Sequence, residues 1–166
     1  MKRNIQESKL RQFNALEATP KEPPPAYSGR AVRRSEPDQH LDSLAAQLID
    51  AALAVHKTLG PGFLEAVYEE ALSVELKLRG VPHRRQVPVA VQYKGVSVGE
   101  GRLDLLVDEL LVVELKAVEL LAPIHLAQVL SYLKATKLPL GLLITFNVHQ
   151  LRRGIRRIVL SRTLTL

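Results

Sequence analysis

Asp104, Glu114 and Lys116 are charged residues in two segments that otherwise have the composition of buried β-strands. Asp104 lies in "RLDLLV" (102–107), and Glu114 and Lys116 lie in "LLVVELKAV" (110–118). Side chains alternate between the two faces of a strand, so Glu114 and Lys116 share one face. Charged groups on a half-buried sheet lose hydration at a cost, which raises the question of what they do there.

The register of the hairpin between these two strands decides whether the carboxylates meet. A three-residue loop at 108–110 places Asp104 opposite Glu114 and on the same face. A two-residue loop would place Asp104 opposite Val113 instead. The interpretation of Asp104 and Glu114 as a pair therefore depends on the register.

Two adjacent carboxylates repel each other unless one is protonated or a cation lies between them. A hard divalent cation resolves this conflict, and Mg²⁺ typically binds one or two carboxylates, waters and substrate phosphate oxygens. Lys116 could then polarise an attacking water or stabilise charge that grows on a phosphate. The alternative is a same-face ion pair between Glu114 and Lys116 on a solvated sheet, and the Glu-x-Lys tripeptide alone does not separate the two.

The composition excludes several classes of protein. The 166 residues are 46% hydrophobic, which suits one globular domain, and only 4% aromatic, which argues against an aromatic platform for single-stranded bases. The chain has no cysteine, so disulfides and thiolate metal sites are absent and a reducing compartment is expected. The first residues lack an apolar signal region, and we find no apolar run of membrane-spanning length. We expect a soluble cytoplasmic protein without a membrane partner.

The net charge of +6 is distributed unevenly along the chain. Residues 1–40 hold 8 basic and 5 acidic side chains, and residues 151–166 hold 5 arginines and no acid. Residues 41–150 hold 10 basic and 12 acidic side chains. This distribution suits an acidic site flanked by arginines that contact phosphates, but a solvated basic tail explains it equally well.

Periodicity predicts an N-terminal arm followed by one α/β domain. Residues 1–40 contain "TPKEPPPAYSGR" and form the expected disordered or extended Pro-rich arm; the domain occupies 41–166. The expected order in the domain is α, α, β, β, β, β, α, β, β, that is, a mixed central sheet flanked by helices. The predicted helices are 41–59, 63–79 and 123–136, and the predicted strands are 83–93, a short one after a turn at Gly95, 102–107, 110–118, 138–146 and 154–160.

The chain resembles a known nuclease family. Asp104 with Glu114-Leu115-Lys116, followed by a helix with "HLAQVLSY" (125–132), is similar to the PD-(D/E)XK nuclease superfamily, in the branch related to the RecB nuclease domain. "GFLEAVY" (62–68) matches the signature of the GxxExxY proteins of that superfamily. The resemblance covers about residues 41–160 and implies a restriction-endonuclease-like fold. One departure is Leu103, which stands where the name of the superfamily has proline.

The resemblance implies roles for individual residues. Asp104, Glu114 and the backbone carbonyl of Leu115 would bind the metal, and Glu65 would be an additional ligand. Lys116 would be the catalytic lysine. Gln128 and Tyr132 would orient Lys116 or the substrate phosphate.

Each of these residues also has a structural interpretation. Glu65 lies in the first turn of a predicted helix, where the helix dipole stabilises a carboxylate. Tyr68 has the spacing of a core residue, and Gln128 and Tyr132 could be a polar edge of a packed helix. His125 is expected on the surface, and no metal role is assigned to His56 or His83. Four arginines could contact phosphates or line a solvated strand: Arg152, Arg153, Arg156 and Arg157.

The predicted function is metal-dependent hydrolysis of nucleic-acid phosphodiesters, with Mg²⁺ as cofactor and Mn²⁺ as a substitute. The resemblance favours DNA over RNA. A homodimer would provide one site for each strand of a duplex. Two alternatives remain: a catalytically inactive nuclease-fold module that binds nucleic acid or a protein, and an accessory protein that acts through "PKEPPPAY" (20–27) as a polyproline ligand.

Overall fold

A computed structural model describes residues 39–160, which all belong to one compact unit. Residues 1–38 and 161–166 lie outside the described part of the chain, and so does the predicted arm except for its last two residues. The elements are α2 (Gln39–Leu59), α3 (Glu65–Leu78), β1 (His83–Tyr93), β2 (Val96–Val107), β3 (Leu111–Lys116), α4 (Pro123–Thr136), β4 (Leu140–Thr145), the 3₁₀ turn η1 (Leu151–Gly154) and β5 (Ile155–Val159).

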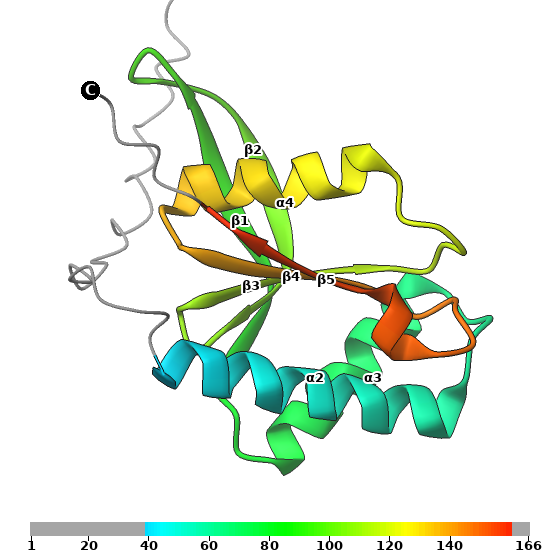
Figure 1. Cartoon of the computed structure of the whole chain (residues 1–166). Coiled ribbons are helices and arrows are strands. Elements are labelled where there is room, and N and C mark those ends of the chain that lie inside the picture. The colour runs from blue at the N-terminus through cyan, green and yellow to red at the C-terminus, as the bar shows by residue number, and fades with distance from the viewer. Residues whose placement is uncertain (1–38, 161–166) are drawn as a thin grey trace, which may run out of the picture. The chain divides into compact units, whose positions relative to one another are not determined.

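The five strands form one mixed sheet in the order β1-β2-β3-β4-β5. Only β3 and β4 are parallel, and α4 connects them. Helices α2 and α3 cover one face of the sheet, and α4 covers the other (Figure 1). This arrangement confirms the predicted α/β class with a mixed sheet flanked by helices.

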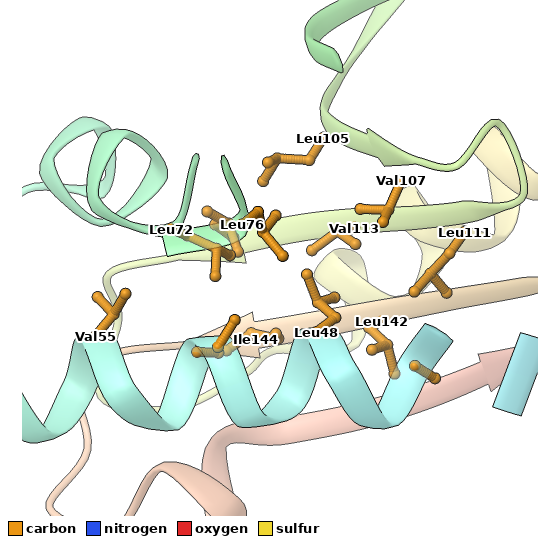
Figure 2. Close-up of a cluster of buried hydrophobic side chains, with 14 of the residues drawn as sticks. Leu48, Val55, Leu72, Leu76, Leu105, Val107, Leu111, Val113, Leu142 and Ile144 are labelled. Carbon is orange, nitrogen blue, oxygen red and sulfur yellow. The ribbon is translucent and has the colours of Figure 1, made fainter. Parts of the chain in front are cut away.

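The larger core lies between the sheet and the helices α2 and α3 (Figure 2). Leu48 and Leu72 from these helices are fully buried against strand residues such as Val113 and Ile144. Burial of one such leucine stabilises the fold by about 2 kcal/mol relative to an exposed one. Aliphatic packing therefore holds this face together, as the shortage of aromatic residues requires. No helix among residues 39–160 combines the length and the apolar character needed to cross a membrane.

The smaller core lies under α4 and depends on glycines in the sheet. A Cβ atom at Gly101 of β2 would lie 2.7 Å from Cε1 of Tyr132, and a Cβ atom at Gly141 of β4 would lie 2.6 Å from a methyl group of Val129. Real side chains do not approach that closely, so only glycine lets α4 pack at this distance.

Two details of the strand prediction turn out differently in the structure. The short strand expected after Gly95 and the strand expected at 102–107 form one continuous strand, β2, because Gly99 and Gly101 sit in the ladder without ending it. The strand β3 ends at Lys116 instead of Val118. Of the two registers left open by the sequence, the structure has the three-residue loop 108–110, because Val107 pairs with Leu111.

Candidate active site

The segment before α3 fixes where Glu65 lies. Gly62 has a φ of 111°, a conformation that favours glycine. The hydroxyl of Tyr68 donates a hydrogen bond to the Gly60 carbonyl (2.8 Å) and accepts one from the Phe63 N–H (3.1 Å). The Gly-x-x-Glu-x-x-Tyr motif thus closes a turn that puts Glu65 in the first turn of α3, where the helix dipole favours a carboxylate.

Tyr68 is a core residue, as its spacing predicted. Its side chain is fully buried and its ring stacks on Phe146, with ring centroids 4.5 Å apart. Phe146 follows β4, so Tyr68 connects the start of α3 to the end of the sheet where β3 and β4 finish. The motif therefore has a structural role at the end of the sheet where β3, the strand of Glu114 and Lys116, finishes.

Asp104 lies where β2 and β3 stop pairing. The ladder ends at Leu105↔Val113, and its continuation by one residue would place Asp104 opposite Glu114. The backbone N–H of Leu115 has no strand partner there and donates instead to Oδ2 of Asp104 (2.7 Å). The Asp104 carboxylate thus takes the place of a backbone carbonyl where the two strands diverge. The bond satisfies the N–H of Leu115 and holds the Asp104 side chain in place.

Gln86 interrupts the other ladder of β2 at the same level. The pairs Arg85↔Leu105 and Val87↔Leu103 flank the position opposite Asp104, and Gln86 between them has a φ of 50°. That conformation is uncommon for a residue other than glycine and requires support from its surroundings. Sequence reasoning missed Gln86, because no pattern in the chain predicts a left-handed glutamine within a strand.

A buried carboxylate on α3 supports the interruption at Gln86. Glu69 is 6% exposed, and its two oxygens accept hydrogen bonds from Arg85 (2.7 Å) and from the amide of Gln86 (2.6 Å). The charge of Glu69 also contributes to the raised pKa of Asp104. Sequence reasoning missed Glu69 as well, although an acid at the buried position next to Tyr68 in α3 was a usable signal.

Glu114 is the most deeply buried charged group of the site. It is 2% exposed and lies in β3, where every other residue except Lys116 is apolar. Its Oε1 accepts a hydrogen bond from Nζ of Lys116 (2.7 Å), and its buried Oε2 has no hydrogen-bond partner among residues 39–160. Burial and then repulsion by Asp104 raise the pKa of Glu114 from 4.5 to about 7, against the opposing bond from Lys116.

Asp104 and Lys116 belong to the same electrostatic group. Burial raises the pKa of Asp104, although the Leu115 N–H and Lys116 oppose the shift. Burial alone would lower the pKa of Lys116, but the hydrogen bond and the charge of Glu114 raise it above its ordinary value. The lysine therefore stays protonated near neutral pH, and the two carboxylates resist being charged together.

Glu65 is near the pair but does not complete a ligand cluster. Its charge raises the pKa of both Asp104 and Glu114. Across residues 39–160, no three His, Asp or Glu side chains are grouped closely enough to hold a metal ion. The structure therefore brings together Asp104, Glu114 and Lys116, with Glu65 at a longer distance.

Gln128 and Tyr132 lie one turn apart on α4, the helix that covers the face of Glu114. Val112 belongs to the core under α4, while Val113 and Leu115 belong to the opposite core, so alternation directs Glu114 toward α4. The Gln128 amide donates a hydrogen bond to the Tyr132 hydroxyl (3.2 Å). In the described part of the chain, neither side chain hydrogen-bonds Lys116, which instead binds Glu114.

The four arginines do not form one surface. Arg157 forms an ion pair with Asp42 of α2, whereas Arg156 donates to the carbonyls of Arg153 and Ile155. Neighbouring residues of β5 also point to opposite faces of the sheet. Arg152 and Arg153 are exposed in η1 and form no ion pair within residues 39–160. Their turn packs on the end of β4, because Gly154 lies against Thr145, the partner of Lys116 in the ladder.

The histidines have structural partners. His125 accepts a hydrogen bond from the Ala122 N–H at the start of α4 (3.1 Å). His56 contacts the Val148 carbonyl (2.7 Å), and His83 contacts Ser73 (2.8 Å). None of the three is near the carboxylate pair in a metal-ligating group within the described residues.

The mixed sheet, its flanking helices and the carboxylate pair at the divergence of β2 and β3 define an α/β protein with a restriction-endonuclease-like fold. The family model of the PD-(D/E)XK nuclease superfamily matches residues 42–158. The chain therefore belongs to this superfamily, whose members are in general metal-dependent nucleases. Among curated proteins, none matches this chain closely enough to count as a relative.

Proposed function

We propose that this protein is an active nuclease that hydrolyses phosphodiester bonds with Mg²⁺, or with Mn²⁺ in its place. One observation carries the proposal: in the described part of the chain the buried Oε2 of Glu114 has no partner, and the carboxylate of Asp104 is close enough to raise the pKa of Glu114. An unsatisfied buried carboxylate costs several kcal/mol in general, so a fold retains one mainly where a ligand completes it.

The donor set fits a hard divalent cation. Asp104 and Glu114 offer carboxylate oxygens, and the Leu115 carbonyl would add a neutral one. Glu65 would contribute through a bridging water or after a change of rotamer, because its charge already acts on both carboxylates. When bound, the ion would supply a water with a lowered pKa and would stabilise negative charge on the phosphate.

The remaining steps fall to side chains of this chain. Lys116, held protonated by Glu114, would orient the attacking water and offset the charge that develops on the phosphoryl oxygens. The Tyr132 hydroxyl and the Gln128 amide would position the substrate phosphate from the α4 side. Arg152 and Arg153 would contact a neighbouring backbone phosphate from η1, whereas Arg156 and Arg157 are less available because both are engaged.

We infer that the chain belongs to the GxxExxY group in the RecB-like branch, and the resemblance to that branch is our ground for proposing DNA as the substrate. Support comes from the motif Gly62-x-x-Glu65-x-x-Tyr68, because each of its three residues has a defined role at the start of α3. Further support comes from Gln128 and Tyr132, the Gln-x-x-x-Tyr pair on α4, because a hydrogen bond joins their side chains. The catalytically inactive module remains the alternative, and the unpaired Glu114 oxygen speaks against it.

The test is cleavage of supercoiled plasmid, labelled single-stranded DNA and labelled RNA with Mg²⁺, Mn²⁺ or EDTA. Wild type is compared with Glu114→Gln and Lys116→Met, and Glu100→Gln on the exposed β1–β2 hairpin is the matched control. We expect metal-dependent cleavage of DNA by wild type and by the control, and a loss of cleavage in the other two variants. Equal inertness of all four proteins would support the inactive module.

A further inference from the structure

Helix α3 carries a second apolar surface on the side that does not face the core. Its core side is formed by Tyr68, Leu72 and Leu76, which are fully buried. The other side presents exposed apolar residues over the whole length of the helix. We define the α3 stripe as Leu64, which immediately precedes the helix, with Val67, Ala71, Val74 and Leu78. Leu64 and Leu78 are each 78% exposed, Val67 and Val74 are 40% and 47% exposed, and Ala71 is half-buried at the edge of the larger core.

The residues of the α3 stripe follow each other at intervals of three, four, three and four. This is the heptad spacing of a helix that packs against another helix along a narrow seam. Scattered exposed apolar residues are normal on a protein surface, but a continuous stripe at this spacing is not expected by chance on a 14-residue helix. Beside the stripe, Leu59 of α2 with Ala66 and Glu70 lines a shallow, mainly apolar groove.

The charges beside the stripe favour a second copy of the same helix. Glu70 and Lys77 are seven residues apart, so they flank the same side of the α3 stripe, and both are exposed. Glu70 also forms an ion pair with Arg85 of β1, but its side chain remains 58% exposed and can meet a second cation. In an antiparallel pair of α3 helices, Glu70 of each copy faces Lys77 of the other, which gives two opposite-charge contacts. In a parallel pair, Glu70 would face Glu75 of the other copy, which gives two like-charge contacts.

We propose that the α3 stripe is a dimerisation surface, on which two copies of this chain pair through antiparallel α3 helices about a two-fold axis. An isologous contact of this kind closes on itself and leaves no stripe exposed. One short helix of each copy forms the contact, so we expect a weak dimer at the low end of the interface size classes, with a dissociation constant of about 1 to 100 μM.

The proposal does not depend on nuclease activity, but it has a consequence for the candidate site. Glu65 lies in the first turn of α3, and an antiparallel pair places the two first turns at opposite ends of the seam. A helix of this length spans roughly 20 Å at 1.5 Å per residue. The two candidate sites would therefore lie on opposite sides of the two-fold axis.

A charge-exchange experiment tests this pairing by sedimentation velocity of the full chain over about 1 to 300 μM, a range that brackets the expected dissociation constant. Wild type is expected to dimerise. Lys77→Glu and Glu70→Lys each create two like-charge contacts and should weaken the dimer at least tenfold when measured alone. An equimolar mixture of these two variants restores both opposite-charge contacts and should form a heterodimer with an affinity close to that of wild type.

Two further variants separate this surface from others. Leu78→Glu places a charge in the stripe and should abolish the dimer, whereas Val98→Glu on the β1–β2 hairpin changes an apolar residue that is also well exposed (60%) and should leave the dimer intact. Circular dichroism verifies that each variant is folded. A monomeric wild type throughout the range, a dimer that survives Leu78→Glu, or a mixture that fails to associate would overturn the proposal.

Discussion

The neighbouring strands β3 and β4 are almost equally buried but differ in what they bury. All six residues of β4 are buried, as are five of the six in β3. In the parallel ladder, Glu114 stands beside Leu143 and Lys116 stands beside Thr145. Strand β4 therefore contributes apolar burial to both cores, while β3 buries charge at the same depth.

Thr145, the polar residue of β4, differs from Glu114 of β3 in how its buried polar atoms are satisfied. Thr145 is 1% exposed, but its hydroxyl donates to the Val118 carbonyl and accepts from the Val118 N–H. Glu114 is just as buried and keeps one oxygen without a partner. Thr145 thus satisfies the rule for buried polar groups, and Glu114 breaks it. Strand β4 thus satisfies its buried polar group within the fold, whereas β3 carries a buried carboxylate that is paired through one oxygen.

The largest expected effect follows from removing the charge of Glu114. Glu114→Gln keeps the shape of the side chain but removes a proposed metal ligand, so we expect cleavage to fall on the order of 10³-fold. The metal-free domain should become more stable at pH 8, where the wild-type fold has to bury an ionised Glu114. Single-turnover cleavage and urea unfolding of the same preparation measure both effects, and a loss of stability would contradict the comparison of the strands.

A core substitution in β4 should show the opposite pattern. Leu142 is fully buried on the α2 and α3 side, so Leu142→Ala should cost about 2 to 5 kcal/mol of the free energy of unfolding. Cleavage per folded molecule should stay within a fewfold of wild type. Urea unfolding and active-site titration test this, and a selective loss of cleavage in a stably folded variant would mean that β4 also serves the chemistry directly.

The pH dependence of stability should report the buried carboxylate. The folded-state pKa of Glu114, about 7, is above the ordinary 4.5, so the folded state binds more protons than the unfolded state between these values. Its contribution is therefore favourable at low pH, falls as pH rises through this window and costs at most ~3 kcal/mol above it. Metal-free wild type should lose stability from pH 5 to 8 relative to Glu114→Gln. Parallel pH profiles of the two proteins would refute the raised pKa.

A smaller effect is expected where α4 meets β2. Gly101→Ala would place a methyl group against the Tyr132 ring, so we expect a loss of about 1 to 3 kcal/mol of unfolding free energy and weaker cleavage through the displaced Gln128–Tyr132 pair. Gly99→Ala is the matched control, because a Cβ atom there meets nothing within 4 Å. Thermal unfolding of both variants measures the difference, and equal melting temperatures would show that α4 moves freely on the sheet.

Much of this fold could be predicted from local pattern. The spacing of leucines in α2, the proline at the start of α4 and the alternation in β3 give the elements and the α/β class. The sequence left two loop lengths open between β2 and β3, and the structure has the three-residue loop 108–110 on which the pairing of Asp104 with Glu114 depends. Features that depend on the local spacing of residues could therefore be predicted from the sequence.

Contacts that depend on long-range packing could not be predicted. The separation of β2 from β3 beyond Leu105, which makes Asp104 a partner of the Leu115 N–H, is set by the whole sheet. The support of Gln86 by Glu69 is set by the packing of α3 on β1. The partners of Arg156 and Arg157, which lie on β5, likewise appear only in three dimensions.

The most direct test of the central claim is calorimetric titration of Mg²⁺ and Mn²⁺ into the metal-free protein at pH 8, where metal binding is read without any cleavage. We predict that wild type and Glu100→Gln bind the ion and that Asp104→Asn and Glu114→Gln lose this binding, while all four proteins remain folded. Equal binding by all four, or binding by none of them, would contradict the claim that the buried carboxylates of β2 and β3 form a site for a divalent cation.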